Sequence, residues 1–301
     1  MNWSETRKRL LNLATTRSEA DRGRDLPEHG EGRVPAASLC VASGKGGTGK
    51  SVVSAALAGI LSARGRTLLV DADLGVGNAH ILQDVTPPRS FVDVVEGEAD
   101  VRECIVACSG RCDLVAGGSG VPRMAELSKF ELHLLAGGLA DVEGEYRFLL
   151  VDSAAGVSRQ TVSFARAADR TLVVTTPDLT AMTDAYAFLK VLEARGARQV
   201  PFLVVNRASS EEEALEVVER LERVTERFLG RNPRYLGWVP DDPAVRRAVN
   251  GRTAVTVAEP HSEAARALRR IAGALARELG DVDPGGLGRS LRQEVGYSRR
   301  I

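Results

Sequence analysis

A glycine-rich segment at residues 43–51, SGKGGTGKS, carries the side chains best suited to bind phosphate groups. Glycines let backbone N–H groups turn inward, and the helix expected to begin near Gly49 adds its positive dipole end. The pattern G-x-x-x-x-G-K-[ST] predicts that Lys50 contacts the β and γ phosphates of a nucleotide and that the Ser51 hydroxyl ligates Mg²⁺. The expected phosphate cradle comprises Gly44, Lys45, Gly46, Gly47, Thr48, Gly49, Lys50 and Ser51.

Acidic residues follow two apolar segments further along the chain. Asp71 and Asp73 come after residues 67–70, and Asp152 comes after residues 148–151. Ligands of α/β sheets bind at the carboxyl ends of strands, so we expect these carboxylates beside the phosphates. Asp73 is a candidate for orienting the attacking water and for ligating Mg²⁺, with a turn-forming role as its alternative. Asp152 would hold Mg²⁺, through water, as in a Walker B strand.

Backbone and amide groups could complete the nucleotide site. Gly156 can bring a backbone N–H close to the γ-phosphate, and the Asn206 amide could bind an adenine edge, although turn formation is its alternative. The N-K-x-D stretch that many GTP-binding P-loop proteins use is absent from the sequence, so we expect ATP with Mg²⁺ as the cofactors. The predicted nucleotide-binding residues beyond the glycine-rich segment are Gly156, Asn206, Arg207, Pro240 and Asp242.

The elements that must position these residues alternate along the chain. Short, nearly continuous apolar segments are typical of parallel strands covered on both faces, and longer amphipathic segments between them indicate helices. The sequence therefore predicts an α/β fold with a doubly wound, mostly parallel sheet and helices on both faces, as in P-loop NTPases. The predicted strands are 38–42, 67–70, 114–116, 148–151, 171–175, 200–205 and 235–239. The predicted helices are 50–64, 123–139, 159–167, 181–194, 210–229 and 262–279.

Length, charge and hydropathy indicate how the chain is divided into domains and where in the cell it is located. The 301 residues include 40 basic and 40 acidic side chains, so bulk charge indicates no attraction to nucleic acid. We expect a polar arm at 1–36, one ATPase domain at 37–280, and a linker with a C-terminal segment at 281–301. No stretch resembles a signal peptide or a membrane-spanning helix, which predicts a cytoplasmic protein.

The cysteines and the C-terminus each suggest a further role. Cys104, Cys108 and Cys112 would share one face of a continuous helix and could hold a metal, but without a C-x-x-C pair we expect small buried hydrophobic residues. Leu287, Leu291 and Val295 recur every four residues beside several arginines. This segment is predicted to lie in a membrane interface, with a disordered tail as the alternative.

The glycine-rich segment has two lysines, Lys45 and Lys50, and so resembles the deviant Walker A motif of the MinD/ParA family. The segments 73–78, 117–121, 152–156, 175–178 and 183–186 resemble the FlhG branch of that family, also called FleN or YlxH. The resemblance covers residues 38–279 and implies an ATP-dependent homodimer in which Lys45 reaches the partner's phosphates. It also implies slow, partner-stimulated ATP hydrolysis, peripheral membrane contact, and control of flagellar number or placement with an FlhF-like GTPase and flagellar basal-body proteins.

Three alternative functions remain open from the sequence. A partition or cargo-positioning ATPase of the ParA type would need a basic DNA-binding surface. A metabolic synthetase of the same superfamily would need a second substrate pocket. An iron–sulfur carrier would need suitably placed bridging cysteines.

Overall fold

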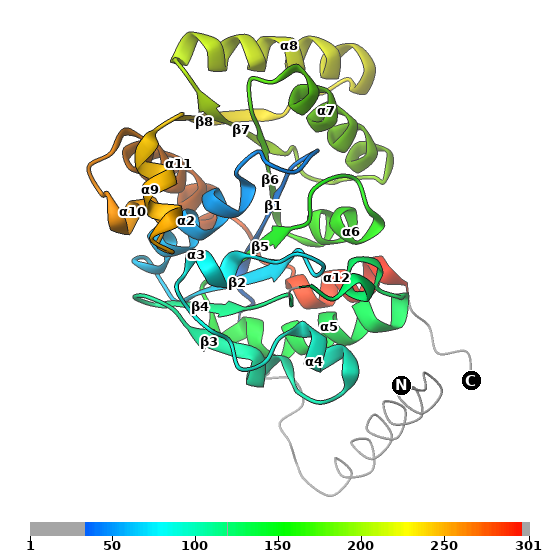
Figure 1. Ribbon diagram of the computed structural model, residues 1–301. Coiled ribbons are helices and arrows are strands. Elements are labelled where there is room, and N and C mark those ends of the chain that lie inside the picture. The colour runs from blue at the N-terminus through cyan, green and yellow to red at the C-terminus, as the bar shows by residue number, and fades with distance from the viewer. Residues whose placement is uncertain (1–33, 119, 297–301) are drawn as a thin grey trace, which may run out of the picture.

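One large sheet organises the part of the chain that the structure describes, residues 34–118 and 120–296 of a computed structural model. Its eight strands run in the order β3-β4-β2-β5-β1-β6-β7-β8, and every neighbouring pair is parallel except β3 with β4 (Figure 1). The strands are β1 (Ala37–Ala42), β2 (Thr67–Ala72), β3 (Ile105–Ala107), β4 (Cys112–Val115), β5 (Phe148–Ser153), β6 (Arg170–Thr175), β7 (Phe202–Ala208) and β8 (Arg234–Pro240).

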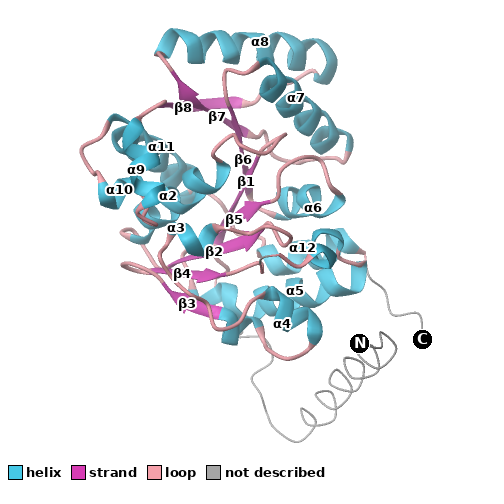
Figure 2. Ribbon diagram, viewed as in Figure 1, coloured by secondary structure: helices cyan, strands magenta, loops and turns pink. Residues whose placement is uncertain are grey.

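Helices cover both faces of this sheet (Figures 1 and 2). One face packs against α2 (Lys50–Ser62), α3 (Ala79–Leu82), α9 (Pro243–Asn250), α10 (Val255–Ala258) and α11 (Glu263–Gly280). The other packs against α4 (Phe91–Glu96), α5 (Lys129–Val142), α6 (Arg159–Ala167), α7 (Leu179–Ala194), α8 (Glu211–Leu229) and α12 (Leu287–Val295). Short 3₁₀ turns are η1 (Val101–Cys104), η2 (Pro122–Glu126) and η3 (Glu143–Glu145). The predicted doubly wound α/β fold is confirmed.

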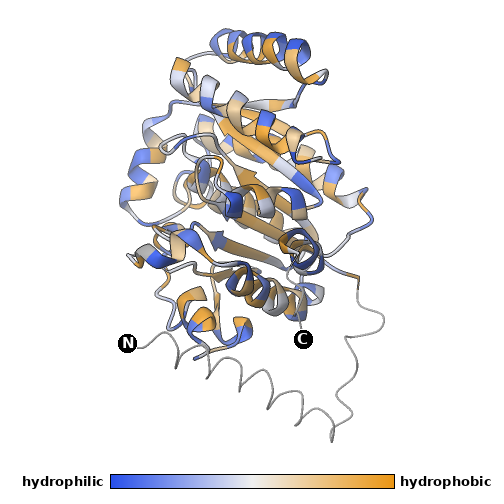
Figure 3. Ribbon diagram, turned by 90° about the vertical axis from the view of Figure 1, so that its right-hand side faces the viewer, coloured by the Kyte–Doolittle hydropathy of each residue, from blue (hydrophilic) through white to orange (hydrophobic). Residues whose placement is uncertain are grey.

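Successive side chains of a strand point to opposite faces of the sheet, so each strand contributes to the hydrophobic cores on both faces. In β1, Leu39 and Val41 face the α2 side, whereas Cys40 and Ala42 face the α6 side, and all four are fully buried. Both faces of a central parallel strand are covered, so most residues of the strands are apolar, as the largely orange strands in Figure 3 show. All seven predicted strands are present, because strands covered on both faces have apolar sequences that can be recognised.

The sequence prediction was wrong in three places where local pattern and fold differ. The predicted helix 123–139 is two elements, η2 and α5, because Ser128 forms a capping box with Glu131 and starts a new helix. The edge strand β3 was missed, since its three residues are only partly buried and carry little hydrophobic pattern. The short helices α3, α4, α9 and α10 were missed as well.

The cysteine run also differs from its prediction. Cys104 ends η1 and Cys112 begins β4, with the antiparallel strand β3 between them, so no continuous helix aligns the three thiols. Cys104 and Cys112 are buried and Cys108 is half-buried. Burial raises the pKa of the Cys104 thiol to about 12, which keeps it protonated and apolar. Within the described ranges, no group of three His, Cys, Asp or Glu side chains could hold a metal ion.

The C-terminal prediction needs the largest correction. Leu287, Leu291 and Val295 are 0%, 0% and 2% exposed, because α12 packs against α5 and α6 (Figure 1). Gly288 permits this contact, since a Cβ there would overlap the backbone of Ala136 and Ala140. The apolar face predicted to lie in a membrane interface is therefore part of the core, and the ATPase domain extends beyond residue 280. Residues 1–33 of the predicted arm and residues 297–301 lie outside the described part of the chain.

Replacing Leu291 with alanine is expected to lower the free energy of unfolding by about 3 kcal/mol, the usual cost of a large-to-small change in a core. Urea unfolding followed by circular dichroism would measure it. Gln293→Ala, on the exposed side of the same helix, is the matched control and should change stability by less than about 0.5 kcal/mol. Equal unfolding midpoints for Leu291→Ala and the wild type would show that α12 is not docked in solution.

None of the described helices combines the length and the apolar character needed to cross a membrane.

Candidate functional site

The glycine-rich loop joins β1 to the N-terminus of α2 at the carboxyl edge of the sheet. Gly47 and Gly49 have φ values of 82° and 83°, a left-handed conformation that glycine adopts without strain. No side chain caps α2, and its first turn contains no acidic residue. Its N-terminal N–H groups and dipole are therefore free of a competing anion, which fits a phosphate ligand.

Beneath the loop, Lys50 forms a buried ion pair with Asp152 at the end of β5. Lys50 Nζ lies 2.7 Å from Asp152 Oδ1, and the two side chains are 7% and 1% exposed. The Ser54 hydroxyl lies 3.0 Å from the same Oδ1. Asp152 Oδ2 is buried without a hydrogen-bond partner. A buried carboxylate oxygen that lacks a donor is the kind of group that Mg²⁺ or its water would satisfy, so Asp152 fits the predicted metal role.

Asp71, near the end of β2, and Asp73, just after the strand, have different roles. Asp71 is fully buried, and its two oxygens accept hydrogen bonds from the backbone N–H groups of Asp73 (3.2 Å) and Ala79 (3.0 Å). Burial, followed by the negative charge of Asp152, raises the pKa of Asp71 to about 7. Asp73 is half-buried and accepts a backbone hydrogen bond from Val76 at 3.3 Å. Asp71 therefore holds the loop that carries Asp73.

The first lysine of the loop contacts α7. Lys45 Nζ donates to Thr180 Oγ1 at 2.8 Å in an exposed position. Gly44 lies so close to α7 that a Cβ there would overlap the backbone of Asp184. Lys45 is thus accessible at the edge of the site, while its predicted contact with a partner's phosphates stays a prediction.

Two groups predicted to contact the nucleotide form hydrogen bonds with other parts of the protein. The Gly156 N–H, predicted to face the γ-phosphate, donates to the Ser43 carbonyl at 2.9 Å, and its contact with the γ-phosphate stays a prediction. The Asn206 amide donates to the Thr48 carbonyl at 2.8 Å and packs under Gly49. Asn206 therefore holds the loop from β7, and its contact with adenine stays a prediction.

The loops after β7 and β8 carry the remaining predicted residues. Arg207 is exposed at a β-bulge with a φ of 59°, and its Nε lies 3.8 Å from Asp241 Oδ1. Pro240 ends β8 and is half-buried. The Asp242 carboxylate accepts from the N–H groups of Ala244 (2.8 Å) and Ala264 (3.1 Å), at the N-termini of α9 and α11. The structure therefore places the Asp242 carboxylate at two helix N-termini, and its contact with the nucleotide stays a prediction.

Replacing Asp242 with alanine is expected to lower the free energy of unfolding by about 2 kcal/mol at pH 7, because α9 loses its N-cap and the Ala264 N–H of α11 loses its acceptor. Burial favours a higher pKa for Asp242, but backbone hydrogen bonds and the charge of Arg247 outweigh it, so the pKa lies below its usual value. A depressed pKa stabilises the fold above the unfolded-state pKa of about 4, and this contribution is lost as the pH falls through the folded-state pKa.

Urea unfolding at pH 7 and at low pH would measure this effect. The difference between Asp242→Ala and the wild type should shrink in acid. Asp241→Ala is the matched control, since that carboxylate is 61% exposed and has only a long ion pair with Arg207. An equal loss of stability in both variants would contradict the capping role.

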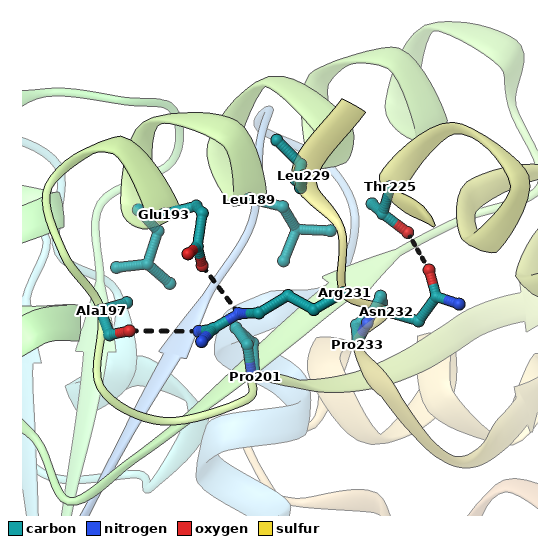
Figure 4. Close-up of a pocket in the computed structure, with 10 residues that line it drawn as sticks. Leu189, Glu193, Ala197, Pro201, Thr225, Leu229, Arg231, Asn232 and Pro233 are labelled. Carbon is teal, nitrogen blue, oxygen red and sulfur yellow. Dashed lines mark hydrogen bonds and ion pairs between the residues drawn. The ribbon is translucent and has the colours of Figure 1, made fainter. Parts of the chain in front are cut away.

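A surface pocket between α7 and α8 lies away from all of these residues. Figure 4 shows Arg231 held there by Glu193 and the Ala197 carbonyl, and Thr225 bonded to Asn232. These polar groups satisfy one another, so the pocket is a structural junction and not the nucleotide site.

Comparison with known proteins agrees with the geometry. Residues 39–254 match the family described as "CbiA: CobQ/CobB/MinD/ParA nucleotide binding domain". The chain belongs to this MinD/ParA family. The family consists of P-loop ATPases, and the glycine-rich loop, Lys50 and Asp152 all lie within the matched residues.

Relatives place the chain within the family. It is 37% identical over 239 residues to "Antiactivator FleN" of Pseudomonas aeruginosa, covering 79% of this chain and 85% of that protein. It is 30% identical over 246 residues to "Flagellum site-determining protein YlxH" of Helicobacter pylori, covering 80% and 82%. The septum site-determining protein MinD of Pyrococcus horikoshii, solved with Mg-ADP, has a TM-score of 0.70 at 23% identity, covering 83% of this chain and 99% of that one, and shows the same fold.

Sequence reasoning missed Ser54, Thr180 and the clamping role of Asp71. Ser54 follows Lys50 by four residues, which places both on one face of α2, so helical spacing could have identified it. Thr180 meets Lys45 only through the packing of α7, 135 residues further along the chain. No local pattern predicts that contact.

Proposed function

We propose that this protein is a MinD-like ATPase that dimerises with ATP and regulates flagellar number or placement. The observation that carries the proposal is the match over about four-fifths of the chain to an antiactivator and a flagellum site-determining protein, together with an intact phosphate loop. A partition ATPase and a metabolic synthetase are not favoured, because these two relatives match the chain over 239 and 246 residues at 37% and 30% identity.

The residues divide the work of ATP hydrolysis among them. The loop and the N-terminus of α2 would bind the phosphates, with Lys50 neutralising the β and γ groups. Ser51 and Asp152 would hold Mg²⁺, which supplies positive charge against the charge that develops on the phosphates. Asp73 would orient the attacking water, and Asp71 would fix the loop that carries it. Lys45 would leave Thr180 and reach the phosphates bound to the second protomer.

The partners and the location are part of the same proposal. An FlhF-like GTPase and flagellar basal-body proteins are the proposed partners, and partner binding would stimulate a slow intrinsic hydrolysis in the cytoplasm. Peripheral membrane contact through the apolar face of α12 is not part of the proposal, because that face packs against α5 and α6.

Mg-ATP, but not Mg-ADP, is expected to convert the monomer into a homodimer, because only the γ-phosphate gives Lys45 an anionic partner across the interface. Light scattering after size-exclusion chromatography would measure the mass. Lys45→Ala should bind ATP but stay monomeric, and Lys190→Ala on α7 is a control lysine substitution away from the loop. A monomeric mass with Mg-ATP, in the wild type and in a hydrolysis-deficient variant, would contradict the proposal.

A further inference from the structure

The hydroxyl of Ser54 lies next to the carboxylate predicted to hold the metal. Ser54 is on α2, one turn after Lys50, and is fully buried. Its Oγ lies 3.0 Å from the Lys50 carbonyl and 3.0 Å from Asp152 Oδ1. A serine inside a helix ordinarily bonds to the carbonyl four residues earlier. Here the hydroxyl has a carboxylate as a second acceptor, and a hydrogen bond to a charged oxygen is the stronger of the two.

The two oxygens of Asp152 are in different environments. Oδ1 accepts from Lys50 and from Ser54, whereas Oδ2 is buried without a partner. Lys50 has a second task in the proposed function, because its ammonium must move toward the phosphates when ATP binds. Once the Lys50 ammonium moves, Ser54 is the one remaining side-chain donor to Asp152 among the described residues.

We propose that Ser54 is a positioning residue that anchors Oδ1 of Asp152 and so keeps Oδ2 available to Mg²⁺ when Lys50 turns to the phosphates. The inference rests on the proposed ATPase function and goes beyond it, since it assigns a role to a residue outside the phosphate loop. Donors that orient a ligating carboxylate typically change metal affinity about 10-fold to 100-fold when they are removed.

The test compares ATP affinity with and without Mg²⁺, using a fluorescent ATP analogue with excess Mg²⁺ or with EDTA. In Ser54→Ala, the gain in affinity that Mg²⁺ provides should fall about 10-fold, while affinity in EDTA should stay within about 2-fold of the wild type. Ser62→Ala is the matched control, because that buried serine of α2 bonds only to the Gly59 carbonyl, at 2.8 Å. Ser54→Thr keeps the hydroxyl and should retain the wild-type gain.

A double substitution separates positioning from general damage to α2. In an Asp152→Asn background, Ser54→Ala should cause no further loss of the Mg²⁺ effect, because the two residues act as one unit. If Ser54→Ala fails to fold, Ser54→Cys replaces it in the test. Cysteine is similar in size to serine but is a weaker hydrogen-bond donor, so the affinity gain from Mg²⁺ should again fall.

The outcomes distinguish this inference from the proposed function. A wild-type protein that binds no ATP would overturn both. A wild type with a clear Mg²⁺ effect, and a Ser54→Ala variant with the same effect, would overturn the role of Ser54 alone. An equal loss in Ser62→Ala would also overturn it, since the cause would then be α2 and not Asp152.

Discussion

Replacing Lys50 with alanine is expected to weaken ATP binding by about 100-fold, corresponding to about 3 kcal/mol for a desolvated charge contact. The free energy of unfolding should fall as well, by about 3 kcal/mol, because the variant leaves the Asp152 carboxylate buried beside a single hydroxyl donor. Titration with a fluorescent ATP analogue would measure the first effect, and urea unfolding without nucleotide the second.

The other lysine of the loop provides the control. Lys45 is half-buried and its ammonium donates to the Thr180 hydroxyl in an exposed position, so Lys45→Ala should leave ATP affinity and stability within about 2-fold and 0.5 kcal/mol of the wild type. Wild-type ATP affinity in Lys50→Ala would remove Lys50 from the phosphate site. An unchanged unfolding midpoint would instead contradict the buried ion pair with Asp152.

The sheet and the phosphate loop could be predicted because their signals are local. A central parallel strand is buried on both faces, so residues 148–151 are all apolar and can be recognised as a strand from the sequence. The spacing of glycines and Lys50 is likewise fixed by one turn and the first residues of α2. Such features need no knowledge of the rest of the fold.

Hydrogen-bond partners that lie far along the chain could not be predicted from the sequence. The Asn206 amide, for example, donates to the Thr48 carbonyl, 158 residues earlier in the chain. Asp242 accepts a hydrogen bond from the Ala264 N–H, 22 residues later, a contact that depends on where α11 packs. In both cases the residue type predicts a strong hydrogen-bonding group, whereas the tertiary fold determines its partner.

The C-terminal helix shows the same limit for apolar residues. The four-residue spacing of Leu287, Leu291 and Val295 correctly indicates an amphipathic helix, α12. Periodicity gives the apolar face but not what covers it, because a membrane interface and a protein core favour similar residues. Gly288 permits the close contact of this helix with α5, which its position in the sequence does not reveal.

Replacing Asp73 with alanine is expected to slow ATP hydrolysis by about 100-fold or more, the usual loss when a group that positions or deprotonates a nucleophile is removed. ATP affinity should stay within about 2-fold of the wild type, because Asp71 still accepts from the backbone N–H groups of residues 73 and 79 and so holds the loop without the Asp73 side chain. Phosphate release under single-turnover conditions would measure hydrolysis, and the analogue titration would measure affinity.

Asp73→Asn separates charge from geometry in the same assay. The amide keeps an oxygen that can accept the Val76 N–H hydrogen bond, so the loop should be unchanged, while the negative charge needed to orient or deprotonate water is lost. Both variants should therefore be equally slow and should accumulate as ATP-bound dimers, because assembly precedes hydrolysis in the proposed cycle. Wild-type turnover in Asp73→Asn would show that Asp73 acts by shaping the loop, and a parallel loss of ATP affinity in both would place it among the binding residues.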